Sequence, residues 1–136
     1  CISGTRGSGT IFFSGCTLRC CFCQNSILSK DHFGKELTVH ELGDVFLRLQ
    51  DQGAYNINLV TPTHYFPDII KSLDLVRHRL HIPIVCNCGG YERPQVISQL
   101  KDYIDILTLS ILTMNWPFAI PGQKTILSRP LPPLRR

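Results

Sequence analysis

The sequence has no run of about 18 apolar residues, the length that a helix needs in order to cross a membrane. It shows no signal peptide, and it begins at Cys1 instead of a methionine. We therefore expect a fragment of a longer cytoplasmic protein that has no membrane partner.

Acidic side chains are missing from the end of the chain, where none follows Asp105. Residues 1–111 contain ten basic and ten acidic side chains, so the formal net charge of +4 comes wholly from four Lys and Arg residues after residue 123. A domain without excess positive charge lacks the electrostatic sign of nucleic-acid binding. We expect no nucleic-acid partner.

Hydrophobic periodicity is also missing after residue 109. Five of the nine prolines lie after residue 116, a composition typical of extended or disordered segments. We therefore divide the chain into a domain of residues 1–109 and an irregular, basic, proline-rich tail of residues 110–136.

Three cysteines, Cys16, Cys20 and Cys23, form a C-x3-C-x2-C array directly after the β-branched and aromatic residues 10–13. Three thiolates from one short loop can hold three irons of a four-iron cluster, which leaves the fourth iron open to a small molecule. Cys21 is predicted to be a bystander because its neighbours already supply this spacing.

Two other uses of these cysteines stay open. Structural zinc sites normally have four ligands, and Cys86 and Cys88 could complete such a set. These two are expected to alternate faces of a strand, so that at most one points inward. A disulfide framework would require an oxidising compartment, for which the sequence gives no signal.

Strand and helix patterns alternate along the domain. We expect strands at residues 10–14, 56–60, 84–87 and 103–109, a polar loop at 29–36, and helices at 38–53, 67–76 and from Pro94. Thr38 and Glu41 form a capping box, and Gly53 ends that helix. The order βαβαβαβ predicts an α/β fold with a parallel sheet, whose loops at 16–23, 61–65 and 87–92 converge on one rim.

Several segments resemble radical S-adenosylmethionine (SAM) enzymes, in particular the pyruvate formate-lyase activating enzyme-like subgroup. They are GSGTIFFSGC at residues 7–16, which ends at the first cysteine of the array, NLVTPTHY at 58–65 and GGYE at 89–92, and the resemblance spans residues 2–107. It implies a partial (β/α) barrel of the radical SAM type, truncated after about four parallel strands.

The resemblance also implies the chemistry. SAM would chelate the open iron of a [4Fe-4S] cluster on Cys16, Cys20 and Cys23. The cluster, reduced by an electron donor, would cleave SAM to methionine and a 5′-deoxyadenosyl radical, which abstracts a hydrogen atom. In the activating enzymes the target is a glycine of a partner protein; here the substrate is unknown.

Four further residues are cofactor-binding candidates by the resemblance. Phe22 would lie against the adenine, or else serve as a core aromatic. Thr61 and Thr63 sit where these enzymes often carry a Gly-Gly-Glu-like segment that binds the SAM amino group, but this chain has no acidic residue there. Asn87 would contact SAM, or else simply terminate its strand.

Three residues near these candidates have weaker signals. His64 could act as an acid, although a single histidine in a loop is more often only hydrogen-bonded. Tyr91 and Glu92 could face the substrate, with a solvated loop as the simpler role.

The resemblance predicts Pro-Asp-Phe-Lys-Tyr at the end of the fourth strand, where this chain has Leu-Thr-Leu-Ser-Ile. Permitted codons for residues 106–126, read one base earlier, can encode a family-like continuation. We hypothesise a change of reading frame near Leu107, which a nucleotide sequence unable to encode that reading would contradict.

The sequence thus leaves three functions open. The first is a radical SAM oxidoreductase or activase, and the second is a non-catalytic module that binds zinc or a cluster. The third is an inactive truncated fragment.

Overall fold

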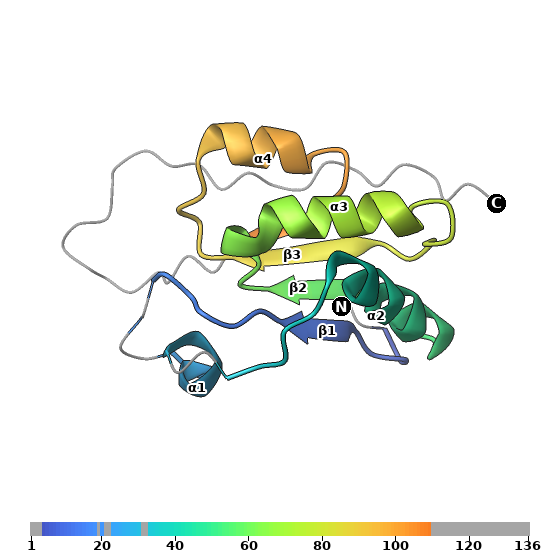
Figure 1. Cartoon of the computed structure of the whole chain (residues 1–136), viewed down its shortest axis with the longest axis horizontal. Coiled ribbons are helices and arrows are strands. Elements are labelled where there is room, and N and C mark those ends of the chain that lie inside the picture. The colour runs from blue at the N-terminus through green and yellow to red at the C-terminus, as the bar shows by residue number, and fades with distance from the viewer. Residues whose placement is uncertain (1–3, 19, 21–22, 31–32, 110–136) are drawn as a thin grey trace.

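The chain folds around one sheet of four parallel strands, in the order β1-β2-β3-β4 (Figure 1). This computed structural model describes residues 4–18, 20, 23–30 and 33–109. The strands span Gly9–Phe12 (β1), Ile57–Val60 (β2), Ile84–Cys88 (β3) and Ile106–Leu109 (β4). The predicted α/β fold with four parallel strands is confirmed.

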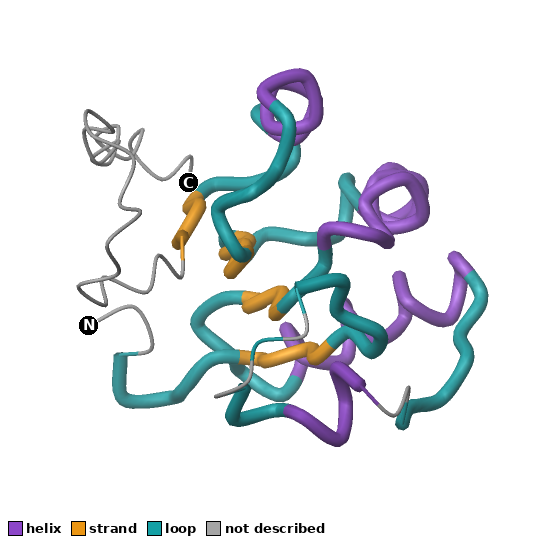
Figure 2. The backbone as a smooth tube through the Cα atoms, turned by 90° about the vertical axis from the view of Figure 1, so that its left-hand side faces the viewer, coloured by secondary structure: helices purple, strands orange, loops and turns teal. Residues whose placement is uncertain are grey.

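Helices alternate with the strands, and three of them lie along the same face of the sheet (Figures 1 and 2). The helical segments are Ser26–Lys30 (α1), Val39–Asp51 (α2), Thr63–Tyr65 (the 3₁₀ turn η1), Phe66–Val76 (α3) and Pro94–Leu100 (α4). The packed face of the sheet meets α2, α3 and α4, because buried residues of these helices join the core cluster.

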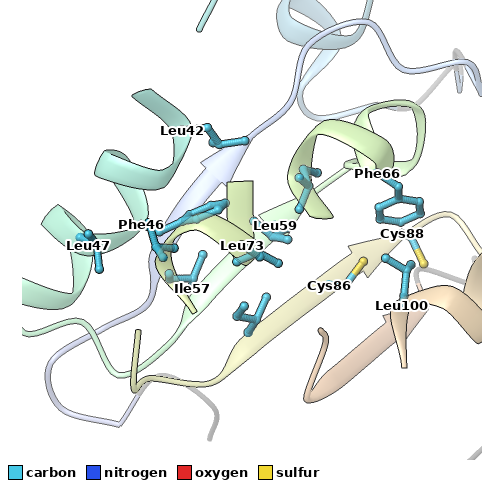
Figure 3. Packing of buried hydrophobic residues seen from close by; sticks show 13 residues of the cluster. Leu42, Phe46, Leu47, Ile57, Leu59, Phe66, Leu73, Cys86, Cys88 and Leu100 are labelled. Atoms are coloured by element: carbon cyan, nitrogen blue, oxygen red, sulfur yellow. The ribbon is translucent and has the colours of Figure 1, made fainter. Parts of the chain in front are cut away.

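The core follows the period of two that a strand imposes. Ile57 and Leu59 of β2 are fully buried, and they pack with Phe46 of α2 and Ile69 of α3 (Figure 3). Each large apolar side chain buried in this way contributes about 1.5–3 kcal/mol. The sheet is therefore held to the helices through β2, one of its two inner strands.

Cys86 and Cys88 both belong to this core, with exposed fractions of 0% and 1% (Figure 3). The expectation that at most one of them points inward was wrong. Side chains two positions apart in a strand lie on the same face of the sheet, so both thiols meet the helical layer.

The start of α2 confirms the predicted capping box. The Thr38 hydroxyl accepts a hydrogen bond from the Glu41 N–H at 3.3 Å, and a Glu41 carboxylate oxygen accepts one from the Thr38 N–H at 2.8 Å. The backbone hydrogen bond from Thr38 lowers the pKa of Glu41. Gly53, with a φ of 83°, follows the helix end as predicted.

Two predicted boundaries were wrong. Residue 29 was expected to begin a loop, but Ser29 lies inside α1, where its N–H donates to the Asn25 carbonyl at 2.9 Å. The fourth strand begins at Ile106 instead of residue 103, because the N–H groups of Tyr103 and Ile104 both donate to the carbonyl of Leu100. The end of α4 thus extends as a turn into the expected strand.

The predicted tail, residues 110–136, lies outside the described residues, as does most of the segment for which a change of frame was hypothesised. Both stay predictions. In the described part of the chain, no helix has the length and apolar character needed to cross a membrane.

Gly43 allows α2 and α3 to approach closely, because a Cβ atom there would lie 2.9 Å from Cγ1 of Val76. We expect Gly43→Ala to lower the free energy of unfolding by roughly 1 kcal/mol. Overpacking costs about 1–3 kcal/mol, of which alanine's better helix propensity returns up to about 1 kcal/mol. Urea unfolding measures the difference.

Val76→Ala supplies the matched background for this test, since it removes the methyl group that the new Cβ would meet. There, Gly43→Ala is expected to be neutral or stabilising. An equal loss in both backgrounds would show that steric contact with Val76 is not the cause.

Candidate functional site

The loops that follow β1, β2 and β3 meet at one edge of the sheet, as the parallel topology predicts. Together they line a small pocket of about 80 Å³. Its lining residues are Cys16, Thr17 and Leu18 after β1, Thr61, Thr63 and His64 after β2, and Gly89, Tyr91 and Glu92 after β3.

The cysteine loop begins directly after β1 and is closed at its base. The Gly15 N–H donates to the Leu28 carbonyl at 3.0 Å, and the Cys23 N–H donates to the Cys20 carbonyl at 3.2 Å. Cys16, Cys20 and Cys23 are all free and only partly buried. The Cys23 thiol lies 3.4 Å from the hydroxyl of Ser29 in α1, so this unexpected helix supports the last cysteine of the array.

The donor set fits an iron–sulfur cluster. No three Cys, His, Asp or Glu side chains in the described ranges surround a position for a single metal ion. A four-iron cluster makes a different demand, because each thiolate binds its own iron and the sulfur atoms stay apart. Three partly exposed thiols on one closed loop meet that demand, and the assignment of Cys16, Cys20 and Cys23 as ligands stays a prediction.

Glycine at position 89 brings the cysteine loop onto the loop after β3. A Cβ atom at Gly89 would lie 2.3 Å from Cδ1 of Leu18, far inside van der Waals contact. A larger residue at position 89 would force the exposed side chain of Leu18 into another position.

Thr61 follows the last residue of β2 and has an unusual conformation, with a φ of 55°. A β-branched residue in the left-handed region is rare and strained, and such strain is held in place by neighbouring contacts. The Thr61 N–H donates to the Asn87 carbonyl at 2.9 Å, and its hydroxyl lies 3.5 Å from the Phe13 carbonyl. Thr61 is therefore fixed to both neighbouring strands.

His64 lies on the β1 side of this loop. Its Nε2 atom is 2.5 Å from the Ser14 carbonyl. Its ring is tilted by 45° against that of Tyr65, with the ring centroids 4.3 Å apart, and the Tyr65 centroid lies 5.6 Å from that of Phe13. A histidine bonded to a backbone carbonyl positions the loop, in line with the simpler of the two roles considered for it.

Thr63 and Glu92 form a contact that the sequence reasoning missed. The Thr63 hydroxyl donates to Oε1 of Glu92 at 2.7 Å, across 29 positions of the chain. Burial raises the pKa of this carboxyl. Hydrogen bonds from the Thr63 hydroxyl and from the backbone of Glu92, with lesser contributions from Cys88 and Gly90, outweigh burial, so the pKa lies below its usual value.

The simpler of the two roles considered for Glu92 was that of a solvated loop residue. In the structure its side chain is partly buried and lines the pocket. A signal existed in the sequence, since the loop after β2 has hydroxyl groups and no acid, while the loop after β3 has an acid. Only the fold shows that they lie side by side.

Asn87 is half-buried near the end of β3, in register with Val60 of β2 and Thr108 of β4. The backbone carbonyl of Asn87 accepts the hydrogen bond from the Thr61 N–H. This bond links two of the residues predicted to bind the cofactor. Phe22 lies outside the described residues, so its predicted place against an adenine stays a prediction.

Cys86 and Cys88 are poor candidates for the missing ligands of a zinc site. The hydrogen bond between the two thiols, their burial and the negative charges of Cys88 and Glu92 raise the pKa of Cys86. Both thiols lie in the apolar core and neither lines the pocket with Cys16, so the structure gives no support for a zinc site that joins them to the cysteine loop.

A larger hollow, of about 180 Å³, lies at the opposite end of the strands, between the end of α3 and the turn that precedes β4. Leu73, Arg77 and Tyr103 help to line it, and none of the predicted site residues does. The chemistry that the cysteines suggest therefore belongs to the smaller pocket.

Comparison with known proteins identifies the family. The sequence profile of the radical SAM superfamily matches residues 10–120. The chain therefore belongs to this superfamily of enzymes. An uncharacterized protein of Methanocaldococcus jannaschii is 32% identical over 108 residues, an alignment that covers 73% of this chain and 31% of that protein. The chain thus spans less than a third of the length of this relative. No solved structure matches the chain.

Thr63→Val is expected to raise the pKa of Glu92, because it removes a hydrogen bond to the carboxylate and leaves the burial that favours the neutral acid. A ¹³C NMR titration of the Glu92 carboxyl carbon measures this. Thr108→Val is the matched control, since its hydroxyl bonds the Cys86 carbonyl at 3.3 Å. A pKa that both variants leave unchanged would contradict the account.

The same contact predicts an effect on stability. A carboxyl with a lowered pKa in the folded state stabilises the fold above its unfolded pKa, and this contribution is lost as the pH falls through the folded pKa. The free energy of unfolding of the Thr63→Val variant should therefore fall less on acidification than that of the unsubstituted chain.

Proposed function

We propose that this chain is the part of a radical SAM enzyme that holds a [4Fe-4S] cluster on Cys16, Cys20 and Cys23 and binds SAM beside it. One observation carries the proposal: three free, partly exposed thiols lie on one closed loop, and the first of them, Cys16, lines a pocket with the loops that follow β2 and β3. When bound and reduced, this pair of cofactors supplies a radical that can abstract a hydrogen atom from a substrate.

The chain's own residues would bind and orient SAM. Thr61 and Thr63 lie on the loop after β2, and Asn87 lies near the end of β3. The resemblance implies that Phe22 would lie against the adenine. The hydrogen bond from Thr61 to the Asn87 carbonyl supports a joint role for these two residues.

The finer assignment is an activating enzyme of the pyruvate formate-lyase activating enzyme-like type, and its support is the similarity of segments 7–16, 58–65 and 89–92. Such an activase acts on a glycine of a partner protein and needs a reducing electron donor. We also propose a cytoplasmic location, because free thiols that ligate a cluster persist in reducing compartments.

Anaerobic reconstitution with iron and sulfide tests the cluster. After reduction, we expect a four-iron electron paramagnetic resonance signal that changes when SAM is added. Cys16→Ser, Cys20→Ser and Cys23→Ser should each lose most of the cluster, because each removes one of only three thiolate ligands.

Cys21→Ser is the matched control, since it makes the same substitution within the same loop. It should keep both the cluster and the response to SAM. Equal cluster content in all four variants would overturn the ligand assignment. A cluster that ignores SAM would favour a non-catalytic module.

A further inference from the structure

The sheet has a second face, which the helices of the described part of the chain leave uncovered. The helices α2, α3 and α4 lie on one side of the four strands (Figures 1 and 2). Side chains alternate along a strand, so the residues on either side of the buried Leu59 point away from these helices. By register, the open face consists of Thr10, Phe12, Asn58, Val60, Val85, Asn87, Ile106 and Thr108. None of these eight belongs to the core cluster that the described residues form.

The open face is apolar enough to need a cover. Phe12 is 48% exposed, and Val60 and Ile106 are half-buried. All-parallel sheets occur almost only with both faces covered. Removing apolar side chains such as these from water stabilises the folded state. The open face is therefore a surface on which an apolar segment can pack.

Two residues at the centre of the open face are already shielded from water. Val85 is 3% exposed, and its partner in register, Asn58, has a buried Oδ1 atom that accepts no hydrogen bond within the described part of the chain. Buried polar atoms are almost always hydrogen-bonded, so this oxygen lacks a donor. An extended segment across β2 and β3 would account for both observations, since it would cover Val85 and bring backbone N–H groups to Asn58.

Residues 110–120 have the composition and the length of such a cover. Their sequence is SILTMNWPFAI, in which seven of eleven residues are apolar and none is charged. Eleven extended residues reach about 36 Å at about 3.3 Å each. Four strands spaced about 4.8 Å apart form a face only about 14 Å wide. A chain that leaves the sheet at Leu109, in the edge strand β4, can therefore cross the whole face.

The rest of the tail is a poorer candidate for this cover. Residues 121–136 contain four basic side chains, four prolines and no acidic residue. Burying unpaired charges costs free energy, so we expect this part to stay in water.

We propose that residues 110–120 of this chain pack across the open face, with their apolar side chains against Phe12 and its apolar neighbours. A backbone N–H of the segment donates to Oδ1 of Asn58. The open face also includes Asn87, so the segment forms a wall beside one of the residues proposed to bind SAM. The packing itself needs neither a cluster nor SAM, and the inference stands apart from the proposed function.

Tryptophan fluorescence of the 136-residue chain tests the proposal, because Trp116 is its only tryptophan and lies within the segment. We expect the emission maximum of the folded chain to lie at a shorter wavelength than that of the chain unfolded in urea. Acrylamide should also quench the folded chain less, since the packed indole is removed from water.

Phe12→Asp should release the segment, because it places a carboxylate beneath an apolar cover. The emission maximum and the quenching constant should then move to the values measured in urea, while circular dichroism shows that the variant is folded. Leu75→Asp is the matched control, since Leu75 is 44% exposed but lies on α3, on the other side of the sheet. It should leave both values unchanged. Phe12→Ser is a second variant in case the first does not fold, and it should shift both values in the same direction.

Three results would overturn the proposal. The first is a Trp116 that is as accessible to acrylamide in the folded chain as in urea. The second is an equal response to Phe12→Asp and Leu75→Asp, which would place the segment elsewhere. The third is burial of Trp116 that disappears when the protein is diluted, which would show that a second copy of the chain provides the cover.

Discussion

Parallel pairing of β2 between β1 and β3 is the constraint on which the site depends. Phe12 pairs with Val60 and Val60 pairs with Asn87, so the last residues of β1 and β2 lie in one row with the penultimate residue of β3. The loops that follow these three strands therefore begin at the same edge of the sheet. Shifting one strand by a residue would separate the cysteine loop from the residues proposed to bind SAM.

Contacts between the loops convert this alignment into a defined pocket. The Thr61 N–H bonds the carbonyl of Asn87, and Gly89 leaves room for Leu18. The strained backbone at Thr61 persists because both neighbouring strands hold it. Thiols, hydroxyls and one carboxylate thus come together from three parts of the chain, which suits a cofactor that is bound at several points.

Local patterns were predicted well. The capping box at Thr38 and the strands at residues 56–60 and 84–87 depend on neighbours a few positions away, so they can be read from the sequence. Short turns were not predicted. The helix α1 has only five residues, and the turn after Leu100 makes β4 shorter than expected. The error at Cys86 and Cys88 came from misapplying the alternation rule, which places residues two positions apart on the same face.

The site was predicted only in part. The topology was enough to bring the three loops to one rim. The bond between Thr63 and Glu92 depends on how two loops fold over 29 positions, and the left-handed Thr61 has no sequence signal, since β-branched residues disfavour that conformation. Both features follow from tertiary contacts, which local propensity does not encode.

The most direct test of the account is Mössbauer spectroscopy of the chain loaded with ⁵⁷Fe, with and without SAM. The account predicts a four-iron cluster in which about one iron in four changes its spectrum when SAM is added, since three thiolates leave one iron open. Four irons that SAM leaves unchanged, or no iron bound by the three cysteines, would contradict it.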